Sequence, residues 1–160
     1  MKKQFIIEPT NKNNIFIECK TKFNWYKTQI RVLYADTDTA RVVYHANYLR
    51  FFEIGRAEIL RDCGASYRLI EEKNVFHPIV KVNMDFYSGA KYDELIDIYV
   101  RPKILETVRF TFDYRLLRQS NAQLLVSGIT VHCCTINGNK VCEVDDITKG
   151  LFEKYGAEKN

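Results

Sequence analysis

The stretch "ANYLRFFEIGRAEILRDCG", residues 46–64, constrains the fold more than any other part of this chain. It is rich in good helix formers, shows no strand alternation, and ends at Gly64, the residue type preferred just past a helix end. The sequence therefore predicts one helix of about five turns. Apolar side chains occupy most sides of this helix, whereas a surface helix shows a narrower apolar stripe. A helix of this kind must be largely wrapped by the rest of the protein.

Several segments in which apolar and polar residues alternate predict strands, and these strands could cover the helix. The first such segment places four residues on one face, as in a half-buried strand: Thr28, Ile30, Val32 and Tyr34. Further strands are predicted over residues 80–86, 96–101, 108–115 and 124–136. Asn137-Gly138 then signals a tight hairpin into residues 141–144. This order of elements predicts an α+β fold in which one long central helix is wrapped by a curled antiparallel sheet.

The length and charge fit one small domain. A chain of 160 residues can bury one sizeable core but not two. The polar loop "NKNN" precedes a strand-like stretch, so we interpret residues 1–26 as an N-terminal extension of unknown role that can add an edge strand. Residues 27–160 form the predicted domain. A net charge of +4 without a clustered Lys/Arg run argues against a nucleic-acid partner.

The N-terminal sequence, the lengths of the apolar stretches and the cysteines bear on the cellular location. The start "MKKQFIIEPTNKNN" has too short an apolar patch for a signal peptide, and no apolar stretch of about 18 residues could span a bilayer. The five cysteines form an odd set without C-x-x-C spacing, and a chain with a real core does not need disulfides. We therefore expect reduced thiols and a cytoplasmic location.

The loop between the first strand and the helix carries the candidate chemistry. Asp36 and Asp38 lie one residue apart, and His45 immediately precedes the helix. The first backbone N–H groups of a helix have no intrahelical partner, and the helix dipole favours negative charge there. A carboxylate beside such donors suits acyl transfer, because the donors stabilise an oxyanion while Asp38 attacks the carbonyl or activates water. Among acyl substrates, a thioester is the one least in need of a strong nucleophile, because its thiolate is a good leaving group.

Other interpretations of these residues remain open. Asp-x-Asp also begins a calcium loop, but Ala40, Arg41 and Asn47 occupy its ligand and glycine positions, and Arg41 also disfavours another metal. Both aspartates could merely cap the loop and helix, and the His45 imidazole could merely pack. The sequence has no G-x-S-x-G motif of a serine nucleophile. Cys133 and Cys134 lie within a predicted strand and are more simply packing residues than nucleophiles. Glu53 and Arg56 most simply form a surface pair on the helix.

The stretch "YADTDTARVVYHANYLRFFEIGRAEIL" resembles the motif of the 4-hydroxybenzoyl-CoA thioesterase family, most closely its YbgC-type acyl-CoA thioesterases. The shared pattern is roughly Y-x-D-T-D-x-x-G-V-V-Y-H-x-x-Y, followed by E-x-x-R. This resemblance implies a hotdog fold, with dimers or tetramers that place active sites at the dimer interface. It also implies that Asp38 is the catalytic carboxylate and that the backbone N–H of His45 polarises the thioester carbonyl. Coenzyme A would be part of the substrate, with no separate cofactor and no metal.

Three positions depart from the family pattern. Arg41 replaces a glycine, which puts a cation near the acyl path at a position where unusual backbone angles can be required. Lys103 is the remaining basic candidate for the coenzyme A phosphates, and Gly89 replaces a frequent proline. Together with Arg41 and Lys103, Tyr44 and Glu53 are the candidate substrate contacts. An acyl-CoA thioesterase is the leading hypothesis; the alternatives are a hotdog module that binds acyl-CoA or acyl carrier protein without turnover, and a hotdog dehydratase or hydratase.

Overall fold

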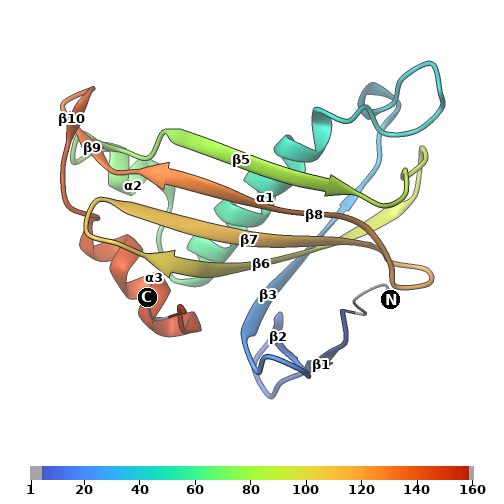
Figure 1. Ribbon diagram of the computed structural model, residues 1–160, viewed down its shortest axis with the longest axis horizontal. Coiled ribbons are helices and arrows are strands. Elements are labelled where there is room, and N and C mark those ends of the chain that lie inside the picture. The colour runs from blue at the N-terminus through green and yellow to red at the C-terminus, as the bar shows by residue number, and fades with distance from the viewer. Residues whose placement is uncertain (1–4, 159–160) are drawn as a thin grey trace.

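The computed structural model describes residues 5–158, and its main element is a seven-stranded antiparallel sheet in the order β1-β2-β3-β6-β7-β8-β5 (Figure 1). The strands of this sheet are β1 Ile7–Pro9, β2 Ile15–Glu18, β3 Asn24–Arg31, β5 Ile79–Phe86, β6 Leu95–Leu105, β7 Arg109–Arg118 and β8 Gln123–Cys133. A small sheet joins β4 Val75–Phe76, β9 Thr135–Ile136 and β10 Lys140–Val141. The α-helices are α1 Asn47–Asp62, α2 Tyr67–Glu71 and α3 Asp146–Tyr155, and a 3-10 turn, η1, covers Tyr34–Asp36.

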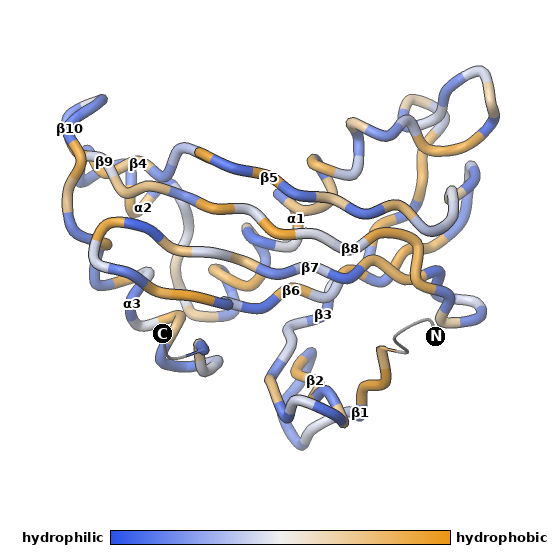
Figure 2. The backbone as a smooth tube through the Cα atoms, in the orientation of Figure 1, coloured by the Kyte–Doolittle hydropathy of each residue, from blue (hydrophilic) through white to orange (hydrophobic). Residues whose placement is uncertain are grey.

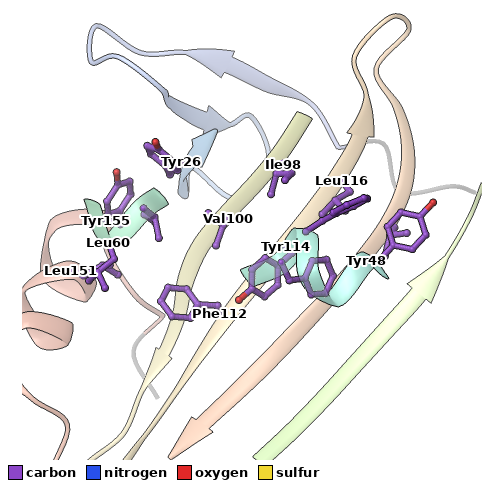
Figure 3. Packing of buried hydrophobic residues seen from close by; sticks show 14 of the residues in the cluster. Tyr26, Tyr48, Leu60, Ile98, Val100, Phe112, Tyr114, Leu116, Leu151 and Tyr155 are labelled. Carbon is purple, nitrogen blue, oxygen red and sulfur yellow. The ribbon is translucent and has the colours of Figure 1, made fainter. Parts of the chain in front are cut away.

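The predicted central helix is confirmed as α1, which lies across one face of the sheet (Figure 1). Phe52 of α1 stacks on Tyr114 of β7 with ring centroids 4.1 Å apart. Gly55 lets the helix approach closely, because a Cβ at this position would lie 2.9 Å from Ile98 of β6. Figure 3 shows side chains of β6, β7, α1 and α3 gathered in this core. Each large side chain buried here contributes roughly 1.5–3 kcal/mol.

The prediction that this helix is wrapped on most sides is only partly met within one chain. The buried residues of α1 occupy one broad face, whereas Leu49 and Glu53 are exposed. The β5 strand has its predicted position, and Figure 2 shows apolar and polar residues alternating along it. However, β5 is the edge of the sheet, and its Val80 and Phe86 are 51% and 52% exposed. Within residues 5–158, therefore, α1 is covered on one face only.

The N-terminal segment adds two strands, β1 and β2, at one side of the sheet, where the sequence suggested a single edge strand. β1 pairs with β2, and β2 pairs with the start of β3, which begins at Asn24 rather than Thr28. Tyr99 of β6 lies between two residues of the main core, so its ring points to the opposite face of the sheet. There it packs with Trp25, Leu117 and Phe5 in a second apolar cluster. This segment therefore covers part of the outer face of the sheet.

The C-terminal third differs most from the prediction. The run over residues 124–136 breaks at Cys134 into β8 and β9, which belong to different sheets. The hairpin at Asn137-Gly138 is confirmed, with φ of 53° and 94° at these residues, but its second strand covers only Lys140–Val141. α3 was not predicted, although Asp145 caps it by accepting from the Thr148 N–H at 3.0 Å. No helix among residues 5–158 is long and apolar enough to cross a membrane.

Candidate active site

Asp36 anchors the loop that connects β3 to α1. Its side chain is buried and accepts hydrogen bonds from the Leu33 backbone N–H, at 2.8 Å, and from the Arg50 guanidinium of α1. Its backbone carbonyl accepts from the Tyr44 N–H at 2.8 Å and from the Asn47 side-chain amide at 2.9 Å. Because all these groups tie one residue to both arms of the loop, Asp36 holds the loop in shape and its carboxylate is fully engaged.

Asp38 lies at the tip of the same loop and is exposed. Its backbone N–H donates to the Val42 carbonyl at 3.0 Å, and its carbonyl accepts from the Arg41 N–H at 2.9 Å. One carboxylate oxygen, Oδ1, accepts from the Ala40 N–H at 2.8 Å, which fixes the direction of the side chain. The other oxygen, Oδ2, has no partner among residues 5–158. Asp38 therefore offers an oriented carboxylate oxygen to solvent.

The N-terminus of α1 offers unpaired donors beside this loop. Ala46 is the N-cap, and no side chain caps the helix there. Among the described residues, neither the His45 nor the Ala46 backbone N–H has a hydrogen-bond acceptor, whereas the Asn47 N–H donates to the Tyr44 carbonyl at 2.9 Å. The His45 ring packs on the Tyr44 ring with centroids 4.3 Å apart. Free N–H groups at a helix start can receive the oxygen of a polarised carbonyl.

Arg41 adopts the left-handed backbone conformation, with φ of 61°. The sequence prediction that this position requires unusual backbone angles is therefore correct. Because a residue with a Cβ pays a steric cost of roughly 1–2 kcal/mol in this region, glycine would fit the turn better. The Arg41 side chain is exposed beside Asp38, so it does not fill the loop.

Replacing Arg41 with glycine is expected to raise the free energy of unfolding by about 0.5 kcal/mol. The relief of backbone strain exceeds the extra flexibility that glycine gives to the unfolded chain. Denaturant unfolding measures the difference, and Lys22→Gly is a matched control because Lys22 is also exposed and has φ of 62°. A loss of stability in Arg41→Gly alone would show that the arginine side chain itself supports the loop.

The other predicted substrate contacts lie in different places. Tyr44 is exposed at the base of the loop, beside His45. Glu53 is exposed two turns along α1. Lys103 lies near the far end of β6, while the Leu95 end of that strand is the one near the loop (Figure 1). A single chain therefore carries Asp38, Arg41, Tyr44 and His45 on one loop but leaves Lys103 at the opposite end of the sheet.

The predicted surface pair of Glu53 and Arg56 is wrong. Arg56 is only 7% exposed, and its guanidinium donates to the hydroxyls of Tyr67 and Tyr114, both at 3.3 Å. Burial opposes the charge of Arg56, yet the two tyrosines raise its pKa, so it stays a cation. Burial also raises the pKa of Tyr114 to about 12. Arg56 is thus a buried structural cation under the helix, and spacing along the sequence could not reveal this.

Two supporting contacts escaped the sequence analysis. Residue Ala90, in the loop after β5, accepts from the Val43 N–H at 2.8 Å and donates its own N–H to the Tyr48 hydroxyl at 3.1 Å. A Cβ at neighbouring Gly89 would lie 2.9 Å from Val42, so glycine allows the two loops to touch. The replacement of proline by Gly89, noted from the sequence, is thus matched by a close contact with the loop that connects β3 to α1. Only the tertiary structure joins these segments.

Comparisons with known proteins place this geometry in a family. A family model described as the Thioesterase-like superfamily matches residues 32–151. The acyl-CoA thioesterase YbgC of Haemophilus influenzae is 32% identical over 119 residues, covering 74% of this chain and 85% of that protein. A crystal structure from Bartonella henselae, described as a "Probable Thioesterase", has a TM-score of 0.72 at 31% identity, and the match covers 76% of this chain and 99% of that one. A 4-hydroxybenzoyl CoA thioesterase complexed with 4-hydroxybenzoyl CoA has a TM-score of 0.71 at 21% identity, covering 79% and 97%, which shows the fold alone.

The long helix on an antiparallel sheet is therefore the hotdog fold, and the fold and relatives define an enzyme of the thioesterase class. The predicted fold class is confirmed. The chain belongs to the thioesterase-like superfamily, and the resemblance to YbgC-type thioesterases that its sequence showed is confirmed as well.

Proposed function

We propose that this protein hydrolyses acyl-CoA thioesters to a carboxylic acid and free coenzyme A, with Asp38 as nucleophile or general base. One observation carries this proposal. The same loop presents a carboxylate that is held in a fixed direction with one oxygen free, and backbone N–H groups that have no acceptor among residues 5–158. Asp38 keeps one oxygen free, and the His45 N–H has no acceptor among residues 5–158. The similarity to acyl-CoA thioesterase YbgC supports coenzyme A, rather than acyl carrier protein, as the thiol.

The reaction follows from these groups. The thioester oxygen accepts from the His45 N–H, which stabilises negative charge as the carbonyl carbon is attacked; such a donor is worth roughly 3 kcal/mol in the transition state. Asp38 either attacks this carbon, giving an anhydride that water then opens, or removes a proton from the attacking water. The C–S bond breaks, a C–O bond from water forms, and the coenzyme A thiolate takes up a proton.

Chromatographic measurement of coenzyme A released from aliphatic and aromatic acyl-CoAs tests the activity and names the acyl class. Chromatography avoids background from the five thiols of the protein. Tight acyl-CoA binding with no release by the wild-type protein would instead favour the binding module, in which Arg41 blocks turnover.

A reducing compartment suits the free cysteines, so we propose that the enzyme works in the cytoplasm.

The active enzyme is proposed to be a homodimer joined through β5. This strand pairs with β8 on one side only, and its exposed side chains include Val80, Val82 and Phe86. Bare apolar edge strands are aggregation sites unless another strand or layer covers them. Pairing two β5 edges would satisfy the free backbone groups, bury these side chains, and cover the exposed side of α1 near the open loop. The β1 edge is a poorer candidate, because it is short and carries Pro9.

Val82→Asp is expected to convert the dimer to a monomer at the same protein concentration and to lower thioester turnover. Burying a carboxylate without a partner in an apolar interface costs several kcal/mol. Sedimentation velocity measures the species, and Val141→Asp is the control because Val141 is 55% exposed in β10, away from β5. A wild-type monomer, or a Val82→Asp protein that remains a dimer, would contradict the β5 interface.

A further inference from the structure

A cluster of metal-ligating side chains lies at the end of the molecule where the small sheet meets α3. His77 follows β4, Cys134 separates β8 from β9, and Asp145 caps α3. The ligand atoms of these three residues all lie within 4.8 Å of one another. Cys142, which follows β10, places its Sγ 3.5 Å from the Cys134 Sγ. This end is opposite the loop that carries Asp38 (Figure 1).

The environment of the cluster suits a cation. The His77 side chain is 3% exposed and the Asp145 side chain 13%, while Cys134 is fully buried. The His77 Nε2 and Asp145 Oδ2 atoms are 2.8 Å apart, and Asp145 keeps its other oxygen on the Thr148 N–H. The Thr148 hydroxyl also donates to Asp145 Oδ2 at 2.9 Å. Hydrogen bonds therefore already fix the imidazole and the carboxylate in place.

We propose that His77, Cys134, Asp145 and Cys142 bind a structural Zn²⁺ ion. Zinc prefers thiolate sulfur, imidazole nitrogen and carboxylate oxygen in a tetrahedron, with bonds of about 2.0–2.3 Å. Ligand atoms in such a tetrahedron are roughly 3.3–3.8 Å apart, by geometry from those bond lengths. The two sulfurs already meet this spacing, and the imidazole and carboxylate must separate by about half an ångström. Cys142 is half-buried and lies outside the group of three, so its side chain would have to rotate toward His77 and Asp145 to become the fourth ligand.

The ion would tie together the end of β4, the break between β8 and β9, the end of β10 and the start of α3. β4, β9 and β10 are only two residues long each, and α3 begins three residues after Cys142 at its Asp145 cap. Short strands of this kind give little stability alone. A zinc ion bound at His77, Cys134, Cys142 and Asp145 would fix this end of the fold without taking part in thioester hydrolysis.

A disulfide between Cys134 and Cys142 is the main competing use of the two sulfurs. A disulfide would use only the two sulfurs, whereas the His77 imidazole and the Asp145 carboxylate also lie within 4.8 Å of the Cys134 sulfur. This convergence of imidazole, thiol and carboxylate favours a metal over a disulfide.

The test measures bound zinc in the full chain, expressed with added zinc and purified with a phosphine reductant and no chelator. We expect about one zinc per chain in the wild type, loss of the zinc in Cys134→Ser and Cys142→Ser, and retention in Cys63→Ser, a half-buried thiol outside the cluster. Replacing zinc with Co²⁺ should give a thiolate-to-cobalt absorption band that weakens in Cys142→Ser. A strong chelator should lower the melting temperature of the wild type but not that of Cys142→Ser.

Three results would overturn the proposal. The first is a wild-type protein without zinc whose melting temperature does not respond to added zinc. The second is zinc that survives both cysteine substitutions. The third is a Cys134–Cys142 disulfide found by mass spectrometry in protein purified without reductant from zinc-rich medium. Because every readout is metal content, absorbance or stability, the outcome is independent of whether the protein hydrolyses thioesters.

Discussion

Asp38→Asn should reduce acyl-CoA hydrolysis by roughly 10²–10⁴-fold or more while leaving the melting temperature nearly unchanged. Asparagine keeps an oxygen that can accept from the Ala40 N–H, so the loop retains its shape. It cannot attack the carbonyl or take a proton from water, so the reactive group is removed without altering the fold. Steady-state turnover measured by chromatographic release of coenzyme A, together with circular dichroism, separates the two effects.

His45→Ala is the matched control for the neighbouring residue. The backbone N–H of position 45 survives this substitution, and the one aromatic ring that the lost imidazole contacts among the described residues is that of exposed Tyr44. Turnover should therefore stay within about tenfold of wild type, because the N–H and not the imidazole polarises the carbonyl. Loss of activity in His45→Ala with full activity in Asp38→Asn would reject the proposed roles and favour a dehydratase-like use of the imidazole.

Arg56→Ala should lower the free energy of unfolding by about 3 kcal/mol. The substitution leaves a cavity between α1 and β7 and removes the donor to the buried hydroxyls of Tyr67 and Tyr114. Tyr114 keeps its hydrogen bond with the Thr130 hydroxyl at 2.9 Å, whereas Tyr67 loses the partner that this structure gives it. Denaturant unfolding measures the loss, and Arg56→Lys is a milder variant should the alanine protein not fold.

Glu53→Ala tests whether Arg56 is a buried cation, as in this structure, or forms a surface ion pair with Glu53. Glu53 is exposed and has no salt bridge among residues 5–158, so its removal should change the free energy of unfolding by less than about 0.5 kcal/mol. If Glu53 and Arg56 formed a surface pair, both alanine variants would cost a similar amount, below about 1 kcal/mol. Equal small effects would therefore contradict the buried position of Arg56.

The local chemistry of this protein is readable from its sequence. The run over residues 46–64 predicted α1 because helix formers and the closing Gly64 act within a few residues of each other. The period of two predicted the long strands, and Asn137-Gly138 predicted the hairpin through its own backbone preferences. The left-handed backbone of Arg41 followed from a single residue in a recognisable motif. Each of these features depends on interactions between neighbours in the chain.

The remaining features depend on which distant segments meet. Arg56 is buried because Tyr114 of β7 and Tyr67 of α2 lie against α1, and no spacing within α1 encodes those contacts. α3 escaped prediction because its helical pattern is short and its cap, Asp145, is held by His77 from 68 residues away. The same folding brings His77 to Cys134 and Ala90 to Val43. The sequence thus determined the helix, the strands and the candidate catalytic loop, whereas the tertiary structure decided burial, partners and the second cluster, because those depend on packing between segments far apart in the chain.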